Sequence, residues 1–305
     1  MIFCNHRYWY YLRKDDTTNS KNIQNTFLNN RNDFRKPLIK LNLIDNFLFS
    51  TFMENPEYSR ELVKLIIKRA TGRTLENFTI ESQKMFNGID TDRHGICLDV
   101  LIKEKSSFDN TKEVYNIEPN TYYDANIARR NRYYNSLTDS KLLFSGKDYD
   151  TLPELITIWI LSYDPFGDNR MVYSVKNLVT ENPSIGYNDG VTTLFLNTKG
   201  KIGGSEELAN LLRFFSETNE DTAVDSDLRD IQRIVDTIKG DSKVGDKYMG
   251  MRSEIYYEKK ISFTEGKAEG ISEGEEMAKI EIAKRLKDLG VDHSIIEQAI
   301  ANGTE

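Results

Sequence analysis

Residues 95–120 contain two strand-length stretches, GICLDVLIKE (95–104) and KEVYNIEPN (112–120), with a polar loop between them. A third stretch of the same kind, ENFTIESQKMF (76–86), comes shortly before them. All three are rich in residues that favour strands, and polar or glycine-containing loops separate them. Together they predict a meander of three antiparallel strands.

Two helices are expected before this meander, over residues 41–53 and 59–72, where apolar residues recur at helical spacing. Gly72 supplies a C-terminal stop for the second helix, because glycine readily adopts the left-handed conformation in which helices end.

After the meander, residues 122–143 again show helical spacing, and ELITIWILSYDPFG (154–167) is an apolar run without alternation. Such a run is typical of a strand that is buried on both faces. Two more strands are expected at 170–179 and 191–198, and the pattern beyond Gly200 is helical. We therefore expect an α/β fold in which helices flank a mixed sheet.

The C-terminal region contains a short repeat in which Gly266, Gly270 and Gly274 each follow a glutamate. A glycine inside a helix costs about 1 kcal/mol relative to alanine. Either another helix approaches this glycine ridge closely, or the segment is a solvated, frayed linker. We expect the first, with a homodimer formed through the C-terminal helices.

Four segments are expected along the chain. They are a poorly ordered N-terminal arm (1–36), the sheet-containing core (37–200), a helical region (201–263), and the glycine-repeat helix with a small helical hairpin (264–305).

Hydrophobic residues make up 38% of the 305 residues, which is enough to bury a core, and the mean hydropathy is −0.57. The apolar runs fall far short of the about 20 residues that span a bilayer. Residues 1–36 lack the apolar centre of a secretory signal. Two cysteines and three scattered histidines favour neither a disulfide scaffold nor a zinc site. These features predict a cytoplasmic protein without a membrane partner.

The formal net charge of −7 argues against a protein coated in nucleic acid, because nonspecific affinity for DNA comes from many contacts between basic side chains and phosphates. A local basic surface is still compatible with an acidic total. Arg129, Arg130 and Arg132 form the tightest basic cluster, which is either a DNA-binding patch or a solvated helix face. His94 precedes one of the predicted strands, where it is either solvated or in reach of a substrate phosphate.

Neither of the common phosphate-binding motifs, GxxxxGK[ST] and GxGxxG, occurs in the chain. The glycine-rich stretch 200–204 is expected to lie outside a strand-to-helix connection. No nucleotide cofactor is therefore expected.

Two carboxylates are the strongest candidates for chemistry. Asp99 lies among apolar residues of a predicted strand, where its charge is unfavourable without a partner. Glu118 and Asn120 share one face of the next strand, because side chains alternate along a strand. Converging carboxylates repel each other, and Mg²⁺ or Mn²⁺ relieves this repulsion. Alternatively, Asp99 and Glu118 are polar residues facing the edge of the meander.

The segments HGICLDVLIKE, YNIEPN, ARRNRYYNSL and ITIWILSYDPFG occur in this order and spacing in the chain. In this combination the chain resembles the PD-(D/E)XK nuclease superfamily, and within it the nuclease-family transposases and recombination-promoting nucleases. The resemblance covers residues 41–305 and implies a restriction-endonuclease-like core, with Asp99 and Glu118 as catalytic residues that bind the metal.

Asn120 occupies the position of the family's catalytic lysine, so the resemblance implies a site that lacks this positive charge. The charge could be supplied by Lys103 or by one of the three clustered arginines. The superfamily sometimes adds an acidic ligand from the first helices, which makes Asp45 and Glu61 candidates.

The implied function is that of a Mg²⁺- or Mn²⁺-dependent DNA endonuclease, linked to recombination or mobile elements. The alternative is a nuclease-fold protein that binds nucleic acid or another protein without cutting. Asn120 and the net charge of −7 favour that alternative.

Overall fold

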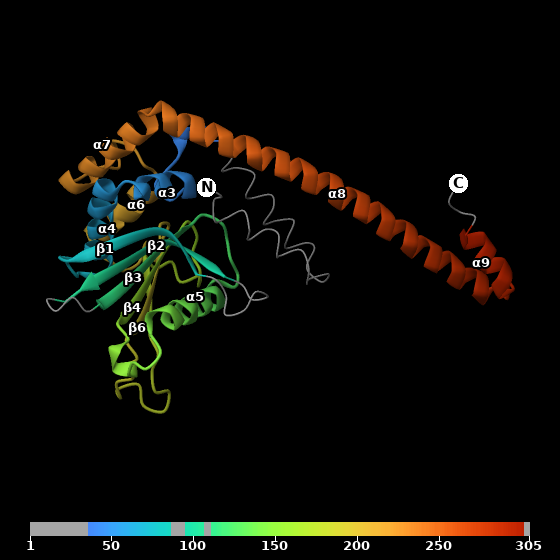
Figure 1. The fold of residues 1–305 in the computed structure, drawn as a ribbon, viewed down its shortest axis with the longest axis horizontal. Coiled ribbons are helices and arrows are strands. Elements are labelled where there is room, and N and C mark those ends of the chain that lie inside the picture. The colour runs from blue at the N-terminus through green and yellow to red at the C-terminus, as the bar shows by residue number, and fades with distance from the viewer. Residues whose placement is uncertain (1–35, 87–94, 107–110, 302–305) are drawn as a thin grey trace. The chain divides into compact units, whose positions relative to one another are not determined.

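The computed structural model describes residues 36–86, 95–106 and 111–301. Its centre is a six-stranded mixed sheet with strand order β1-β2-β3-β4-β6-β5 (Figure 1). The expected mixed α/β fold is confirmed. The expected N-terminal arm (1–36), apart from Lys36, and His94 lie outside the described residues.

The sheet begins with the predicted antiparallel meander and continues with parallel strands. The β1–β2 and β2–β3 pairs are antiparallel, β3 pairs in parallel with β4, and β4 pairs in parallel with β6. The short strand β5 pairs antiparallel with β6 at the edge. The strands are β1 (Phe78–Phe86), β2 (Ile96–Lys105), β3 (Thr111–Asn120), β4 (Glu154–Leu161), β5 (Val172–Val175) and β6 (Val191–Asn197).

Helices cover both faces of the sheet. One face carries α5, and the other carries the group formed by α3, α4, α6 and α7 (Figure 1). In chain order the helices of this part are the short helix η2 (Leu38–Lys40), α3 (Asn46–Glu54), α4 (Pro56–Thr71), α5 (Ile127–Leu142), the short helix η3 (Tyr149–Thr151), α6 (Glu206–Ser216) and α7 (Ser226–Gly240).

Local signals explain where α4 begins and ends. The side chain of Asn55 accepts hydrogen bonds from the amides of Glu57 and Tyr58, and Pro56 takes the first helical position. Gly72 ends the helix with φ 73°, as its position in the sequence predicts.

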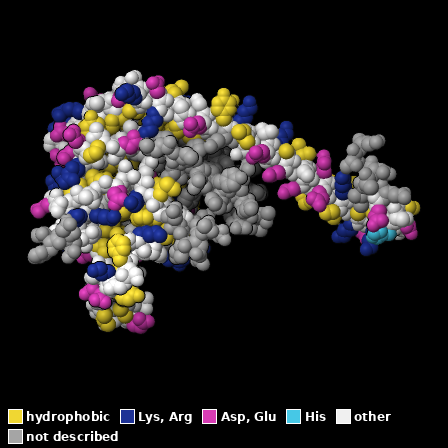
Figure 2. All heavy atoms as spheres, viewed as in Figure 1, with side chains coloured by type: hydrophobic (Ala, Val, Ile, Leu, Met, Phe, Trp, Pro, Cys, Tyr) yellow, Lys and Arg dark blue, Asp and Glu magenta, His cyan; other side chains and the backbone are white. Residues whose placement is uncertain are grey.

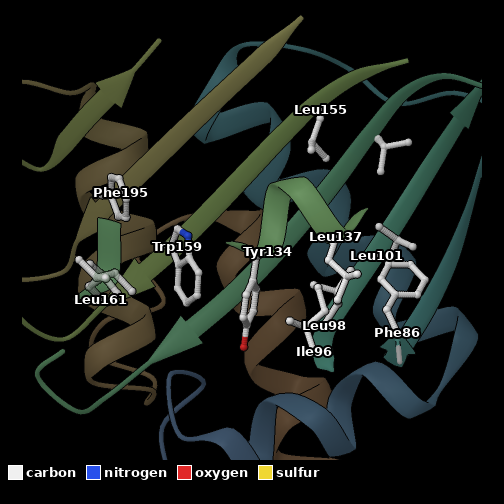
Figure 3. Close-up of a cluster of buried hydrophobic side chains, with 12 residues drawn as sticks. Phe86, Ile96, Leu98, Leu101, Tyr134, Leu137, Leu155, Trp159, Leu161 and Phe195 are labelled. Atoms are coloured by element: carbon white, nitrogen blue, oxygen red, sulfur yellow. The ribbon is translucent and has the colours of Figure 1, made fainter. Parts of the chain in front are cut away.

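Strand β4 is buried on both faces, as its unbroken apolar run predicts. On the α5 side, Trp159 packs against Tyr134 with 5.6 Å between ring centroids, in a cluster with Leu137 and strand residues such as Leu101 and Phe195 (Figure 3). Polar contacts also hold α5 in place: the indole of Trp159 donates to Asn131, whose amide donates to Thr193. The interior of the sheet therefore fixes which face of α5 points inward.

One expectation about the loops is wrong. The glycine-rich stretch 200–204 lies between β6 and α6, and so forms a strand-to-helix connection. The strand expected at 191–198 and the helical pattern after Gly200 already imply such a connection, so the expectation was inconsistent with the elements predicted on either side.

A second compact unit begins at Asp246. It contains most of α8 (Ser242–Asp288), which is one continuous helix through the glycine repeat, and α9 (His293–Ala301). The chain breaks between these two helices at Gly290, which has φ 77°.

Among the described residues no helix has both the length and the apolar content that a membrane crossing needs. Figure 2 shows basic and acidic side chains interspersed over the face in view.

Candidate active site

The sheet opens at Asp99 and Glu118. The β2–β3 ladder runs from the pair Lys105–Thr111 to the pair Val100–Ile117, and stops there. Beyond this point β2 stays paired with β1, and β3 stays paired with β4, but β2 and β3 no longer pair with each other. The next residues along the two strands are Asp99 and Glu118, which therefore lie at the fork where the strands separate.

The Glu118 side chain takes the place of a ladder bond at the fork. Its Oε1 accepts a hydrogen bond of 3.0 Å from the backbone amide of Asp99. Glu118 is only 2% exposed and Asn120 only 3%. Both belong to an interior strand, so the interpretation of Glu118 as a residue facing the edge is wrong.

The backbone is strained opposite Asp99. In the β1–β2 register Ser82 pairs with Val100 and Lys84 with Leu98, which places Gln83 across from Asp99. Gln83 has φ 50°, in the left-handed region that side chains other than glycine rarely adopt. Strained residues of this kind occur preferentially at functional sites.

Burial disfavours the ionised form of both carboxylates. It raises the pKa of Asp99 to about 7, although the nearby Arg130 and a hydrogen bond from Asn46 act in the opposite direction. Burial also raises the pKa of Glu118 well above its usual range, and the neighbouring charge of Asp99 adds to this shift. Two acidic groups with raised pKa values in one enclosed place are a common signature of an active site.

Arg130 brings a positive charge to the two carboxylates from α5. Its Nη1 donates to the hydroxyl of Tyr122 at 2.6 Å, and its Nη2 donates to the hydroxyl of Tyr134 at 3.0 Å. The guanidinium carbon also lies 5.0 Å from the centroid of the Trp159 ring. Burial opposes the charge, but Tyr122, Tyr134 and Glu118 hold the pKa of Arg130 well above its usual value. This arginine is therefore a fixed cation beside Glu118.

Three asparagines complete the surroundings of the carboxylates. The side chain of Asn46, at the start of α3, acts to lower the pKa of Asp99, and that of Asn116 acts to lower the pKa of Glu118. Asn120 accepts a hydrogen bond from the amide of Tyr122 through Oδ1. Its Nδ2 is buried and has no hydrogen-bond partner among the described residues. A buried donor without a partner is energetically unfavourable unless a ligand or water receives it.

The other acidic candidates do not join this site. Asp45 is buried, but its carboxylate accepts from the amide of Asn42 at 2.7 Å and pairs with Lys36 at 3.4 Å. Glu61 is exposed on α4 and lies 3.5 Å from Lys64.

The basic candidates are placed differently from one another. Lys103 pairs with Glu81 at 2.9 Å, four residues along β2 from Asp99, which corresponds to about 13 Å of strand. Arg129 and Arg132 are exposed on α5, whereas Arg130 turns toward the sheet. Of the cations suggested by the sequence within the described residues, Arg130 is the one at the carboxylates.

The carboxylates fit a divalent cation. Their oxygens are the hard ligands that Mg²⁺ and Mn²⁺ prefer, and a cation would favour the ionised forms that burial disfavours. In residues 36–86, 95–106 and 111–301 no cluster of three or more His, Cys, Asp and Glu side chains is suited to a metal. Mg²⁺ commonly uses one or two carboxylates and takes its other ligands from water and substrate.

Sequence reasoning missed several residues of the site. Asn116 lies two residues before Glu118, and Tyr134 lies four residues after Arg130, so strand and helix periodicity could have found both. Asn46 and Gln83 give no such signal, because they reach the site from other elements through the tertiary fold.

Comparisons of the chain with models of protein families, with curated proteins and with solved structures find no match. The function therefore has to be argued from the site itself.

Proposed function

We propose that this protein is a metal-dependent DNA endonuclease of the PD-(D/E)XK type, with the sheet and its flanking helices as a restriction-endonuclease-like core. The observation that carries the proposal is the fork in the sheet, where Asp99 and Glu118 meet in an enclosed place beside the charge of Arg130. The family resemblance of the sequence supports the same reading.

Asp99 and Glu118 would hold Mg²⁺ or Mn²⁺. When bound, such an ion neutralises charge on the scissile phosphate and makes a water molecule more acidic. In the reaction a water oxygen attacks the phosphorus and the 3′ oxygen leaves. Asn120 has a buried amide hydrogen that can be donated to this water or to a phosphate oxygen.

Arg130 supplies the positive charge that the lysine of the motif would provide. It comes from α5 instead of β3, and the hydroxyls of Tyr122 and Tyr134 hold its planar group. A preorganised cation stabilises negative charge that develops on the phosphate in the transition state.

The test is plasmid cleavage by the purified protein in Mg²⁺ or Mn²⁺. Asp99→Ala and Glu118→Ala should each reduce nicking by at least about 100-fold, and Arg130→Gln should also reduce it strongly. Glu61→Ala, which removes an exposed acid away from the fork, is the matched control and should cut like wild type. The enzyme reading fails if wild type is inert with both metals on duplex and single-stranded DNA, or if Asp99→Ala and Glu118→Ala cut equally well.

One observation favours a second candidate, a nuclease-fold protein that binds nucleic acid or a protein partner without cutting. The described residues place two carboxylates and a neutral Asn120 at the fork, with no third acidic ligand. An inert wild type that nevertheless binds DNA would select this candidate.

A further inference from the structure

A cavity of about 750 Å³ lies between α6 and the loop that joins β6 to it. The loop contributes Thr198, Lys199, Gly200 and Lys201, and α6 contributes Arg213 among other residues. The cavity lies at the C-terminal end of a parallel strand, which is where ligands commonly bind in α/β proteins.

The loop backbone is held tightly. A Cβ atom at Gly200 would lie 2.3 Å from the carbonyl oxygen of Arg170, so only glycine fits there. The amides of Lys201 and Ile202 donate to the carbonyl of Asn169 at 2.8 and 3.0 Å. The two lysines therefore start from a fixed backbone.

The cavity is lined with basic side chains that make no ion pair among the described residues. Lys199 and Lys201 are exposed and make no ion pair within the described part of the chain, and Arg213 makes one long hydrogen bond of 3.4 Å to the carbonyl of Asp221. Glu217 is the acidic residue among those that line the cavity. The Oγ1 of Thr198 is buried without a hydrogen-bond partner among the described residues. Three cations and a hydroxyl around one cavity suit an anion with several oxygens, such as a phosphate.

The cavity and the carboxylate fork share one edge of the sheet. Asn120 of β3 pairs with Leu161 of β4, which pairs with Asn197 of β6. Neighbouring strands lie about 4.8 Å apart, so Asn120 and Asn197 are separated by about 10 Å. Each DNA strand carries one phosphate per about 3.4 Å of helix axis, so one strand can span this separation.

We propose that this cavity binds a backbone phosphate of the nucleic acid whose scissile bond lies at Asp99 and Glu118. This inference rests on the proposed function and adds to it a positioning site made by Thr198, Lys199, Lys201 and Arg213. Its role is to hold the strand in register with the fork.

The test measures binding of a fluorescein-labelled 30-base-pair duplex by anisotropy, without divalent cations, over a series of salt concentrations. Lys199→Ala/Lys201→Ala should weaken binding about 10- to 100-fold at 0.1 M salt and reduce the salt slope by about 2. The matched control is Lys147→Ala/Lys176→Ala, which removes two exposed lysines near the opposite ends of β4 and β6 and should retain the wild-type slope.

Thr198→Val distinguishes a role of the hydroxyl in binding from a role in stability. Because the hydroxyl has no partner in the described structure, its loss should leave the melting temperature unchanged and weaken duplex binding several-fold. Unchanged affinity in this variant and in the double-lysine variant overturns the proposal. The proposal is also overturned if the Lys147→Ala/Lys176→Ala control reduces the salt dependence of binding as much as the Lys199→Ala/Lys201→Ala variant does.

Inorganic phosphate distinguishes the source of the anion. Micromolar binding of free phosphate that depends on Lys199 and Lys201, without any effect of these lysines on DNA affinity, contradicts a nucleic-acid site. The assay does not depend on cleavage. If the wild type never cuts but needs these lysines to bind DNA, the phosphate site is supported and the proposed nuclease activity is rejected. If the wild type cuts and the lysine variant binds and cuts equally well, the phosphate site is rejected.

Discussion

We expect Asp99 and Glu118 to reduce the stability of the fold at neutral and alkaline pH. Both carboxylates have pKa values raised by burial, so folding favours their protonated forms. A group of this kind destabilises the folded state once the solution pH exceeds its unfolded pKa, and the loss grows until the folded pKa is reached. Functional sites commonly carry such a cost in stability.

Asp99→Asn is therefore expected to stabilise the metal-free protein while it abolishes cleavage. The gain in unfolding free energy should be small near pH 4, grow as the pH rises to about 7, and stay constant above that. Raising the pKa of Asp99 from its ordinary value to about 7 corresponds to about 4 kcal/mol, which the partial exposure of this side chain reduces to about 1–3 kcal/mol.

Urea denaturation in EDTA at pH 4, 6 and 8 measures this gain. Asp150→Asn, at an exposed aspartate, is the control and should change stability by less than about 0.5 kcal/mol at each pH. An Asp99→Asn protein that is less stable than wild type at pH 8 would show that the carboxylate is a net stabilising group.

The pairing of β1 with β2 contains one irregular position, where Gln83 lies opposite Asp99. Its register is continuous on both sides of Gln83 and Asp99, so the irregularity adds no residue and leaves the pairing of the flanking residues unchanged. The left-handed conformation of Gln83 is the local deviation that accompanies the opening of the sheet.

Gln83→Gly is expected to be neutral or to stabilise the protein by up to about 1 kcal/mol, because glycine adopts positive φ without steric cost. Ser82→Gly, one residue earlier in the same strand, should destabilise it by about 0.5–1 kcal/mol. Thermal or urea unfolding of the two variants gives the comparison. A larger loss in Gln83→Gly than in Ser82→Gly would mean that the Gln83 side chain, and not its backbone, supports the hairpin.

At the scale of the whole molecule, the second compact unit exposes several large apolar side chains along α8. Along α8, Ile261, Ile271 and Ile282 are each more than half exposed, and nothing lies within 4 Å of where side chains would extend from Gly266, Gly270 and Gly274. Because an α-helix has 3.6 residues per turn, the three glycines share one side of α8 and these isoleucines lie on another, so we expect a second helix to approach along the glycines.

We expect the full-length protein to sediment as a dimer at tens of micromolar. Replacing Gly266, Gly270 and Gly274 together by alanine should raise helix content, since each glycine costs about 1 kcal/mol in a helix, and should weaken the dimer by preventing close approach. Sedimentation and circular dichroism separate the two effects. A wild type that is monomeric, or a triple variant that dimerises at least as well, would show that the glycines do not form the contact.

Much of this protein follows from short-range patterns. The stop at Gly72 and the doubly buried strand β4 depend on neighbours in the sequence, and the structure has both in the expected places. The start of α4 was expected at residue 59, but the Asn55 cap places it at Pro56. The proximity of Asp99 and Glu118 was also predictable, because they lie on adjacent strands of a meander.

Other features depend on contacts between distant segments. Helical spacing predicts that Arg129, Arg130 and Arg132 point in different directions around α5. Only the packing of α5 on the sheet determines that, of these three, Arg130 points inward. Asn46 reaches Asp99 from α3, and Gly200 is required by the carbonyl of Arg170 in another loop. Local sequence sets backbone preferences and alternation, whereas burial, charge pairing and close backbone approach are properties of the packed molecule.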